Sequence, residues 1–376
     1  MRGLRTALWT SAALIAWTHV GYPLAAAAVA GRTRRRPDPE PPAQPPTVTL
    51  VIAAHDEERV IDARLRNALA LDYPADRLEV VVSLDGSTDA TGAIARRLGV
   101  RVLDNPRAGK TAAQNAAVAA TDSELIAFSD ANSLWAPDAL RRLVAPFADP
   151  RVGYVCGRLS LIDPASGANV EGTYWRYELW LRAQESRIDS ITAGNGAIYA
   201  VRRDAYVPLS AAHSHDIGLP FRLRRQGLLA LYEPSAVATE PAAPTTSAEW
   251  ERKVRMQSRS WHDVLRGGML DPRGLPARYV VELLSHRLLR YATGPLHLVV
   301  LACALALAPA SRGARAVLGA HAAWLALAAA GRGGAGGRLG ALAWYYLVVT
   351  AASAAGLARM LREGPQATWT AVEGTR

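Results

Sequence analysis

Between residues 47 and 130, short runs rich in β-branched residues alternate with stretches of helical character. The runs predicted to form strands lie at 47–54, 78–84, 100–103 and 124–130. The helices predicted between them lie at 57–70, 88–99 and 110–121. This alternation is typical of a mostly parallel sheet covered by helices on both faces. The sequence therefore predicts an α/β domain whose ligands bind beyond the carboxyl ends of its strands.

Apolar stretches occupy both ends of the 376-residue chain. Residues 8–30 contain no Asp, Glu, Lys or Arg. At about 1.5 Å per residue they are long enough to cross a hydrocarbon core of about 30 Å. Because basic residues follow this span, we expect its C-terminal side to face the cytosol, and a cleaved signal peptide is disfavoured. About three further spans are predicted near 291–310, 316–330 and 339–358.

These patterns divide the chain into six predicted segments. In order they are a transmembrane helix at 8–30, a basic and proline-rich linker at 31–46, the α/β domain at 47–246, amphipathic interfacial helices at 247–290, the C-terminal transmembrane helices within 291–358, and a polar tail at 359–376. The net charge of +10 is concentrated beside the apolar ends, which favours a membrane surface over a nucleic acid as partner. Two cysteines exclude a disulfide scaffold and a cysteine-based metal site.

Acidic clusters follow three of the predicted strands. They read AAHDEE at 53–58, DGSTDAT at 85–91 and SDAN at 129–132. Each cluster alone would also suit a turn or the start of a helix. Together, at neighbouring strand ends, they predict a single binding crevice.

The same segments carry a resemblance to a known family. VTLVIAAHDEE, SLDGSTDAT, RAGKTAAQNAAV and FSDANS, in that order, resemble the donor half of family 2 glycosyltransferases. ITAGNGAIYAVRR and SHDIGLPFRLRRQGLLALYEPSAVATE resemble the acceptor half, and ERKVRMQSRSW resembles the amphipathic segment after it. The resemblance covers about residues 48–262. It implies a GT-A fold, a nucleotide-diphosphate sugar donor of UDP or GDP type, and a divalent metal, Mg²⁺ or Mn²⁺.

The resemblance also implies roles for individual residues. It implies that Asp216 is the catalytic base. The residues implied at the donor are Glu57, Asp85, Gly109, Lys110, Asn115 and Asp130, and those implied at the metal are Asp130 and Asn132. The residues implied on the acceptor side are Gly194, Asn195, Gly196, His215, Arg259 and Trp261.

The chemistry of these side chains agrees with that assignment. A hard cation held by carboxylate oxygens, together with a nearby lysine, can stabilise the charge that grows on a leaving diphosphate. Inversion at the sugar needs one carboxylate within about 3 Å of the attacking hydroxyl. Asp216 is the candidate, and the less favoured alternative is an ordinary helix-cap aspartate before the helical stretch.

Three departures from the family pattern qualify this interpretation. The metal motif reads Asp-Ala-Asn, so Asn132 offers an amide oxygen where a second carboxylate is usual. The acceptor pair reads His215-Asp216, and a zinc site in the His-Ser-His-Asp run is disfavoured because a third ligand is not evident. Gln257-Ser258-Arg259-Ser260-Trp261 is one residue out of register with the QxxRW pattern of processive members, which favours single transfer.

The expected protein is therefore a membrane-anchored, inverting and non-processive glycosyltransferase that acts on a lipid-linked or polysaccharide acceptor. Its Ala- and Arg-rich composition is typical of a bacterium of high GC content, so we expect it in the plasma membrane with a cytosolic catalytic domain. A processive polysaccharide synthase and a non-catalytic nucleotide-sugar-binding assembly subunit remain as alternatives.

Overall fold

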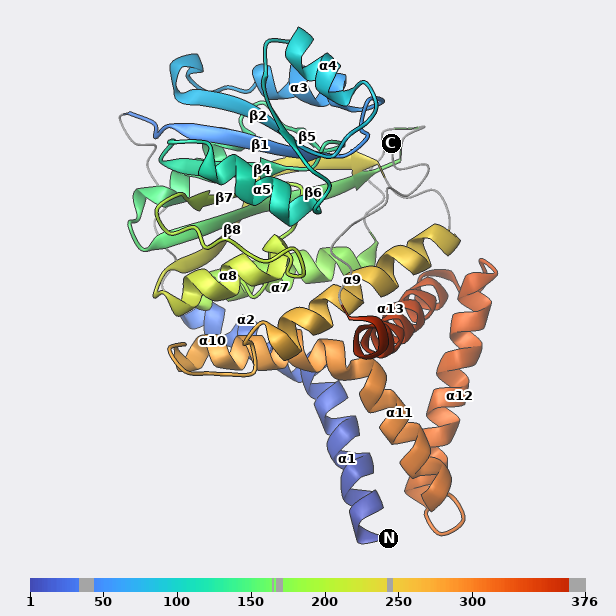
Figure 1. The fold of residues 1–376 in the computed structure, drawn as a ribbon. Helices are drawn as coiled ribbons and strands as arrows, with labels where there is room; N and C mark the ends of the chain where they lie inside the picture. The colour runs from blue at the N-terminus through green and yellow to red at the C-terminus, as the bar shows by residue number, and fades with distance from the viewer. Residues whose placement is uncertain (34–43, 164–165, 167–171, 242–245, 365–376) are drawn as a thin grey trace.

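The computed structural model describes residues 1–33, 44–163, 166, 172–241 and 246–364. A sheet flanked by helices forms the upper part of the molecule in Figure 1, and a group of longer helices extends below it. Most of the linker predicted at 31–46 lies outside the described residues. So does most of the tail predicted at 359–376, whose first residues belong to the last helix.

The four strands predicted from the sequence are present and mutually parallel. They are β1 (Val48–Ala54), β2 (Leu78–Asp85), β3 (Arg101–Asn105) and β4 (Leu125–Ser129). Every residue of β1 and of β4 is buried, which explains their unbroken apolar runs. The prediction of a parallel sheet in this half of the domain is confirmed.

The second half of the domain extends the sheet to eight strands, in the order β3-β2-β1-β4-β7-β6-β8-β5. The added strands are β5 (Leu134–Trp135), β6 (Val152–Ile162), β7 (Tyr199–Arg202) and β8 (Leu229–Pro241). β7 runs antiparallel to both β4 and β6, whereas β6 and β8 are parallel to each other. The sheet is therefore mixed, with β1 to β4 forming its parallel half.

Helices cover both faces of this sheet and enclose two apolar cores. The domain helices are α3 (Ile61–Leu69), α4 (Thr91–Arg97), α5 (Lys110–Ala119), α6 (Ala139–Val144), α7 (Thr173–Ile188) and α8 (His215–Arg225). Two 3-10 turns, η2 (Ala75–Arg77) and η3 (Ala145–Ala148), complete the set. One core includes Leu65 of α3 and Leu140 of α6, and the other includes Val118 of α5 and Leu219 of α8.

Within the described part of the chain, four helical runs are long and apolar enough to cross a membrane: Arg2–Arg32, Ala277–Leu307, Arg312–Arg332 and Gly337–Glu363. The first consists of α1 (Arg2–Ala16), a π-helical segment η1 (Trp17–Gly21) and α2 (Tyr22–Arg32). The second consists of α10 (Ala277–Glu282), a π-helical segment η4 (Leu283–Leu288) and α11 (Leu289–Leu307). These first two runs change direction near their π-helical segments (Figure 1). A π-helical segment is a common cause of a helix bend.

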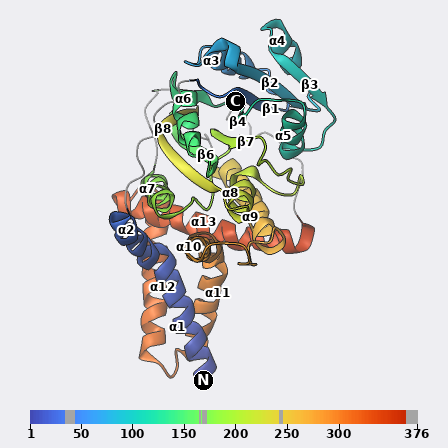
Figure 2. The ribbon, with the colours of Figure 1, turned by 90° about the vertical axis from the view of Figure 1, so that its left-hand side faces the viewer.

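The last two apolar helices, α12 (Arg312–Arg332) and α13 (Gly337–Glu363), differ in orientation. α1, α11 and α12 extend away from the sheet, with the N-terminus at the far end (Figures 1 and 2). Figure 1 looks nearly along α13, whereas Figure 2 shows it lying crosswise beneath the domain. The helix expected at 339–358 therefore has the length and composition of a span, but it does not run alongside the others.

The amphipathic helix predicted after the domain is α9 (Thr246–Arg266). It lies between the sheet domain and the long helices and packs along α13 (Figure 1). Val254, Trp261 and Val264 are buried, whereas Met256 and Leu265 are exposed. The interfacial placement of 247–290 stays a prediction.

Candidate active site

Two of the acidic clusters are joined by hydrogen bonds where β1 and β2 end. Asp56, which has a positive φ of 51°, accepts a 2.8 Å hydrogen bond from the amide of Thr88. The amide of Glu57 donates to the hydroxyl of Thr91 over 2.8 Å, and the Glu57 side chain is buried. These hydrogen bonds join the two strand ends into one edge, at the place where the sequence predicts a binding crevice.

Asp85, at the end of β2, organises the loop that leads into α5. Its side chain is 1% exposed and accepts hydrogen bonds from the amides of Ala108 and Gly109 over 2.7 and 2.8 Å. Its other oxygen pairs with the Arg107 guanidinium at 2.9 Å. Gly109 has a φ of 97°, which favours glycine at this position. The nucleoside contact expected of Asp85 stays a prediction.

Three of the predicted site residues meet around Gly196. A Cβ atom added to Gly196 would lie 3.1 Å from Lys110 Nζ, 3.3 Å from Asp130 Oδ2 and 3.7 Å from Asp216 Oδ1. Lys110 begins α5, Asp130 follows β4, and Asp216 lies in the first turn of α8. Lys110 and Asp130 form an ion pair. The fold therefore brings to one point the groups that the sequence predicts on the donor side and the predicted base.

The charges at this point alter one another's proton affinity. Burial raises the pKa of Asp216 above its ordinary value, and the nearby carboxylate of Asp130 adds to that rise, while Lys110 opposes it. Burial lowers the pKa of Lys110, but Asp130 and Asp216 outweigh burial, so the net change is upward. A lysine that stays protonated and a carboxylate of raised basicity suit charge stabilisation and proton removal, respectively.

Glu240 is a further carboxylate at this site, and the sequence reasoning did not single it out. It lies near the end of β8, and the hydroxyl of Ser133 donates a hydrogen bond to it. Burial and the charge of Asp130 raise the pKa of Glu240 to about 7, against the opposing effects of Ser133 and Lys110. Glu240 could have been identified from the sequence by its position at a strand end, as the last residue of the segment 214–240 that resembles the family.

The donor set near Asp130 consists of oxygen ligands. Asp130 and Asn132 follow β4. Glu240 adds a second carboxylate beside them, because Ser133, the residue after Asn132, donates a hydrogen bond to it. Among the residues that the structure describes, no three His, Cys, Asp or Glu side chains converge as a complete metal site. This set fits a hard cation that is completed by substrate oxygens, and it does not fit zinc.

Hydrogen bonds link His215 and Asn115 through a tyrosine side chain. The buried His215 ring lies 2.7 Å from the Tyr199 hydroxyl through Nδ1 and 3.1 Å from the Tyr206 hydroxyl through Nε2. Tyr206 donates to Asn115 Oδ1 over 2.6 Å, so it accepts from His215 Nε2–H. Burial lowers the pKa of His215 to about 3. His215 is thus a neutral, buried residue, and the Asn115 amide also donates to the Leu209 carbonyl. The acceptor-side role expected of His215 and the donor-side role expected of Asn115 stay predictions.

The Gly194–Gly196 turn is held from within the domain. Asn195 is buried, donates to the Gly157 carbonyl over 2.8 Å and accepts from the amides of Ala197 and Ile198. The amide of Gly194 donates to the carbonyl of Asp216 over 2.7 Å. Asn195 therefore shapes the turn, and Gly196 is the member of this motif that reaches the charged groups.

Arg259 and Trp261 lie on α9 and serve different surfaces. Arg259 donates to the carbonyl of Ala211 over 3.0 Å, five residues before Asp216. The Trp261 indole is 7% exposed and donates to the Ser353 carbonyl of α13 over 3.0 Å. Trp261 thus anchors α9 to α13, and the acceptor-side role expected of it stays a prediction.

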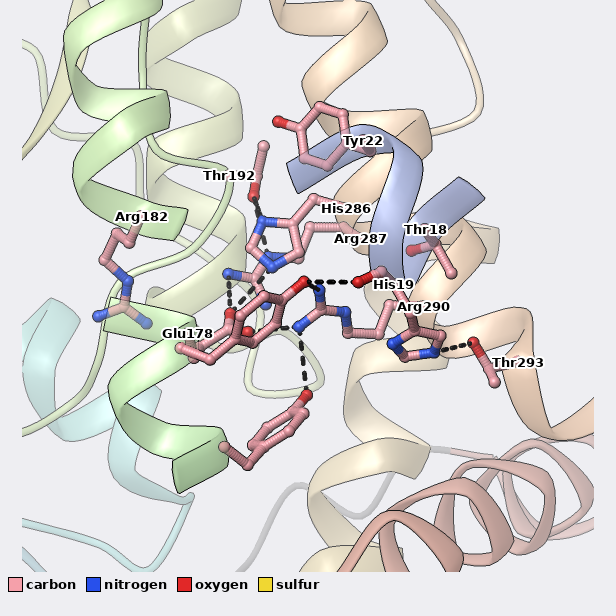
Figure 3. Close-up of polar contacts among 12 residues, drawn as sticks. Thr18, His19, Tyr22, Glu178, Arg182, Thr192, His286, Arg287, Arg290 and Thr293 are labelled. Atoms are coloured by element: carbon pink, nitrogen blue, oxygen red, sulfur yellow. Dashed lines mark hydrogen bonds and ion pairs between the residues drawn. The ribbon is translucent and has the colours of Figure 1, made fainter. Parts of the chain in front are cut away.

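A buried charge cluster joins α7 to the helical run Ala277–Leu307 (Figure 3). Glu178 of α7 pairs with Arg287 at 3.1 Å and with Arg290 at 2.5 Å. His286 lies 2.6 Å from Glu185, which also accepts from a tyrosine of α2. Arg287 Nε donates to Thr192 over 2.9 Å, two residues before Gly194. The apolar runs at both ends of the chain are therefore joined to the sheet domain by buried polar contacts.

Residues 49–207 match the family described as glycosyl transferase family 2. The chain is 28% identical over 242 residues to a probable glycosyltransferase, YdaM, of Bacillus subtilis, covering 59% of this chain and 57% of that protein. It is 34% identical over 161 residues to a beta-monoglucosyldiacylglycerol synthase of Synechocystis sp., covering 41% of this chain and 33% of that protein. The chain spans about half the length, or less, of these curated relatives.

Among solved structures, the fold is similar to that of the mannosyltransferase PcManGT from Pyrobaculum calidifontis, determined in complex with GDP-mannose and Mn²⁺. The TM-score is 0.74 at 24% identity, and the match covers 95% of this chain and 99% of that one. The similarity therefore extends to the long helices as well as the sheet domain.

Proposed function

We propose that this chain, which carries a family 2 glycosyltransferase domain at residues 49–207, transfers a single sugar with inversion from a nucleotide-diphosphate sugar to a membrane-associated acceptor. Asp216 is the general base of this proposed reaction. The observation that carries the proposal is the meeting of Lys110, Asp130 and Asp216 around Gly196 at the carboxyl edge of the sheet.

The donor side would bind and neutralise the diphosphate. Lys110 keeps its proton because Asp130 and Asp216 outweigh the effect of burial on its pKa. Its ammonium group can therefore stabilise the negative charge that develops on the departing diphosphate. The loop that Asp85 fixes just before α5 holds Lys110 at that position.

Asp130, Asn132 and Glu240 would hold a divalent cation, Mg²⁺ or Mn²⁺, together with diphosphate oxygens. When bound, such an ion supplies Lewis-acid stabilisation of the leaving group. Glu240 supplies the carboxylate that the Asp-Ala-Asn motif lacks. The presence of Mn²⁺ in PcManGT supports testing this ion first.

The acceptor side would supply the proton transfer. Asp216 removes the proton from an acceptor hydroxyl as that oxygen bonds to the sugar C1, and the C1–O bond to the diphosphate breaks with its electron pair leaving on the diphosphate. Burial raises the pKa of Asp216, which increases its basicity for this step. Attack opposite the leaving group inverts the configuration at C1.

A membrane acceptor is supported by four apolar helical runs and by the lipid product named for the Synechocystis relative. We propose a bacterial plasma membrane location, with the sheet domain on the cytosolic side. On this assignment, α1, α11 and α12 extend into the bilayer, away from the domain (Figure 2).

Purified full-length protein in lipid nanodiscs tests the proposal. UDP-, GDP- and dTDP-sugars are offered with Mn²⁺ or Mg²⁺ and with diacylglycerol or polyprenyl phosphate as acceptor. We expect nucleotide diphosphate release with one sugar of inverted configuration in the lipid fraction. Long polymer would support a processive synthase, and donor binding without turnover of any pair would support an assembly subunit instead.

A further inference from the structure

Helix α9 contacts residues 213–214, which lie just before Asp216, from the side of the long helices. We infer that Asp263 on α9 is a positioning residue for the transfer reaction, because its carboxylate fixes the backbone that presents Asp216. The inference rests on the proposed function. It assigns Asp263 no contact with the substrate.

The carboxylate of Asp263 uses both of its oxygens on this segment. Oδ1 lies 2.5 Å from His213 Nδ1, and Oδ2 accepts the Ser214 hydroxyl over 2.9 Å. The amide of Ser214 also lies 3.4 Å from Oδ2. The Asp263 side chain is only 1% exposed, and hydrogen bonds to a buried carboxylate are stronger and more directional than those between neutral groups.

These contacts lie immediately before the base. Ser214 is the N-cap residue of α8, yet its side chain makes no capping hydrogen bond within the helix and is committed to Asp263 instead. Asp216 follows two residues later, in the first turn of α8. A small rotation of the segment at Ser214 would therefore move the Asp216 carboxylate relative to Lys110 and Asp130.

The opposite side of the same segment is held by the donor half. The hydroxyl of Thr111, which follows Lys110 on α5, donates to the carbonyl of His213 over 3.0 Å. The segment that bears the base thus lies between the nucleotide-side helix and α9. Asp263 closes this arrangement from the membrane-proximal side.

α9 itself is fixed rigidly to the last helix. Trp261 donates to the Ser353 carbonyl, and a Cβ atom added to Gly356 of α13 would lie 2.6 Å from the Cβ of Gln257. Such close backbone approach leaves α9 little freedom to slide. The position of Asp263, and through it that of Asp216, is therefore set by the seating of α9 on α13.

Asp263→Asn in full-length protein in nanodiscs tests the inference. An asparagine keeps the shape but can no longer accept from both His213 and Ser214. We expect kcat to fall at least about tenfold with the donor KM within about twofold, since small displacements of a catalytic group chiefly affect the chemical step. We also expect faster amide hydrogen exchange in residues 208–216. Asp271→Asn, at an exposed carboxylate paired with neighbouring Arg273, is the matched control.

Ser214→Ala removes one hydrogen-bond partner of Asp263 without changing the charge. This variant tests the inference if Asp263→Asn does not fold. Both variants should show the exchange effect, and Asp271→Asn should not. Unchanged kcat and unchanged exchange in a folded variant would overturn the inference, as would an equal loss of donor affinity. If the wild type shows no turnover, the proposed function fails, whereas the exchange measurement still decides whether Asp263 fixes this segment.

Discussion

Replacing Gly196 with alanine would place a methyl group among the three charged groups of the site. The new Cβ would lie 3.1 Å from Lys110 Nζ, 3.3 Å from Asp130 Oδ2 and 3.7 Å from Asp216 Oδ1. Gly196 does not have a positive φ, so alanine meets no backbone strain there. The perturbation is therefore confined to the space in which donor and acceptor would meet.

The expected effects on stability and on catalysis differ in size. The nearest atoms are the ends of side chains, which can yield by a few tenths of an ångström, and Gly→Ala itself favours folding by about 0.4–1 kcal/mol. Stability should therefore change by less than about 1 kcal/mol. The methyl group would, however, occupy the space in which donor and acceptor would meet, and a misplacement of the reactants by about 1 Å costs about 100-fold in rate, equivalent to about 2.7 kcal/mol.

The assay compares initial rates of sugar transfer and thermal unfolding of the same nanodisc samples. Gly172→Ala is the control, because that glycine is exposed and an added Cβ would meet nothing within 4 Å. Gly196→Ala should lose about 100-fold in kcat/KM at nearly unchanged stability. Activity within about twofold of wild type in a folded Gly196→Ala variant would refute the placement of the reaction at this point.

Three further predictions follow from the buried groups. Burial raises the pKa of Glu240 to about 7, above its ordinary 4.5, so its contribution favours the folded state below pH 4.5 and is lost as the pH rises through 7. In chemical unfolding in EDTA, the free energy of unfolding of Glu240→Gln should exceed that of wild type by up to about 3 kcal/mol at pH 8 and by nothing at pH 4.5. A gain in stability that does not depend on pH would contradict this assignment. Because burial lowers the pKa of His215 to about 3, a folded His215→Phe variant should keep the wild-type shape of the pH–rate profile, and loss of a limb near pH 6–7 would show that the ring titrates during turnover. Trp261→Phe removes the buried indole N–H that donates to the Ser353 carbonyl and part of the packing between α9 and α13, and it should cost about 1–3 kcal/mol in unfolding. Trp180→Phe, at a 41% exposed position on α7, should cost little, and equal costs would contradict the anchoring role.

The donor half of the fold could be predicted because its strands are buried apolar runs with polar groups at their ends. β1, β2 and β4 begin and end within about one residue of their predicted bounds. α7 gave no such signal, because three of its five buried residues, Glu178, Arg182 and Glu185, are charged. The partner of Glu178, Arg290, is 112 residues away, and local sequence carries no trace of such a pairing.

The site was predictable in part for similar reasons. Lys110, Asp130 and Asp216 lie in motifs that the family resemblance identifies, and the structure brings them together. Glu240 was missed because one acidic residue at the end of a strand has no distinctive spacing. The crosswise course of α13 was also beyond reach, since apolar length does not specify orientation (Figure 2).

The central claim is that Asp216 acts as the base of a sugar transfer, and single-turnover transfer by Asp216→Asn tests it most directly. Donor affinity is measured on the same nanodisc samples, with saturating donor, Mn²⁺ and acceptor in the transfer assay. We predict that the transfer rate falls at least about 1,000-fold while the donor dissociation constant stays within about threefold of wild type, because asparagine cannot take the proton. A variant that transfers sugar at a rate near wild type would contradict the account.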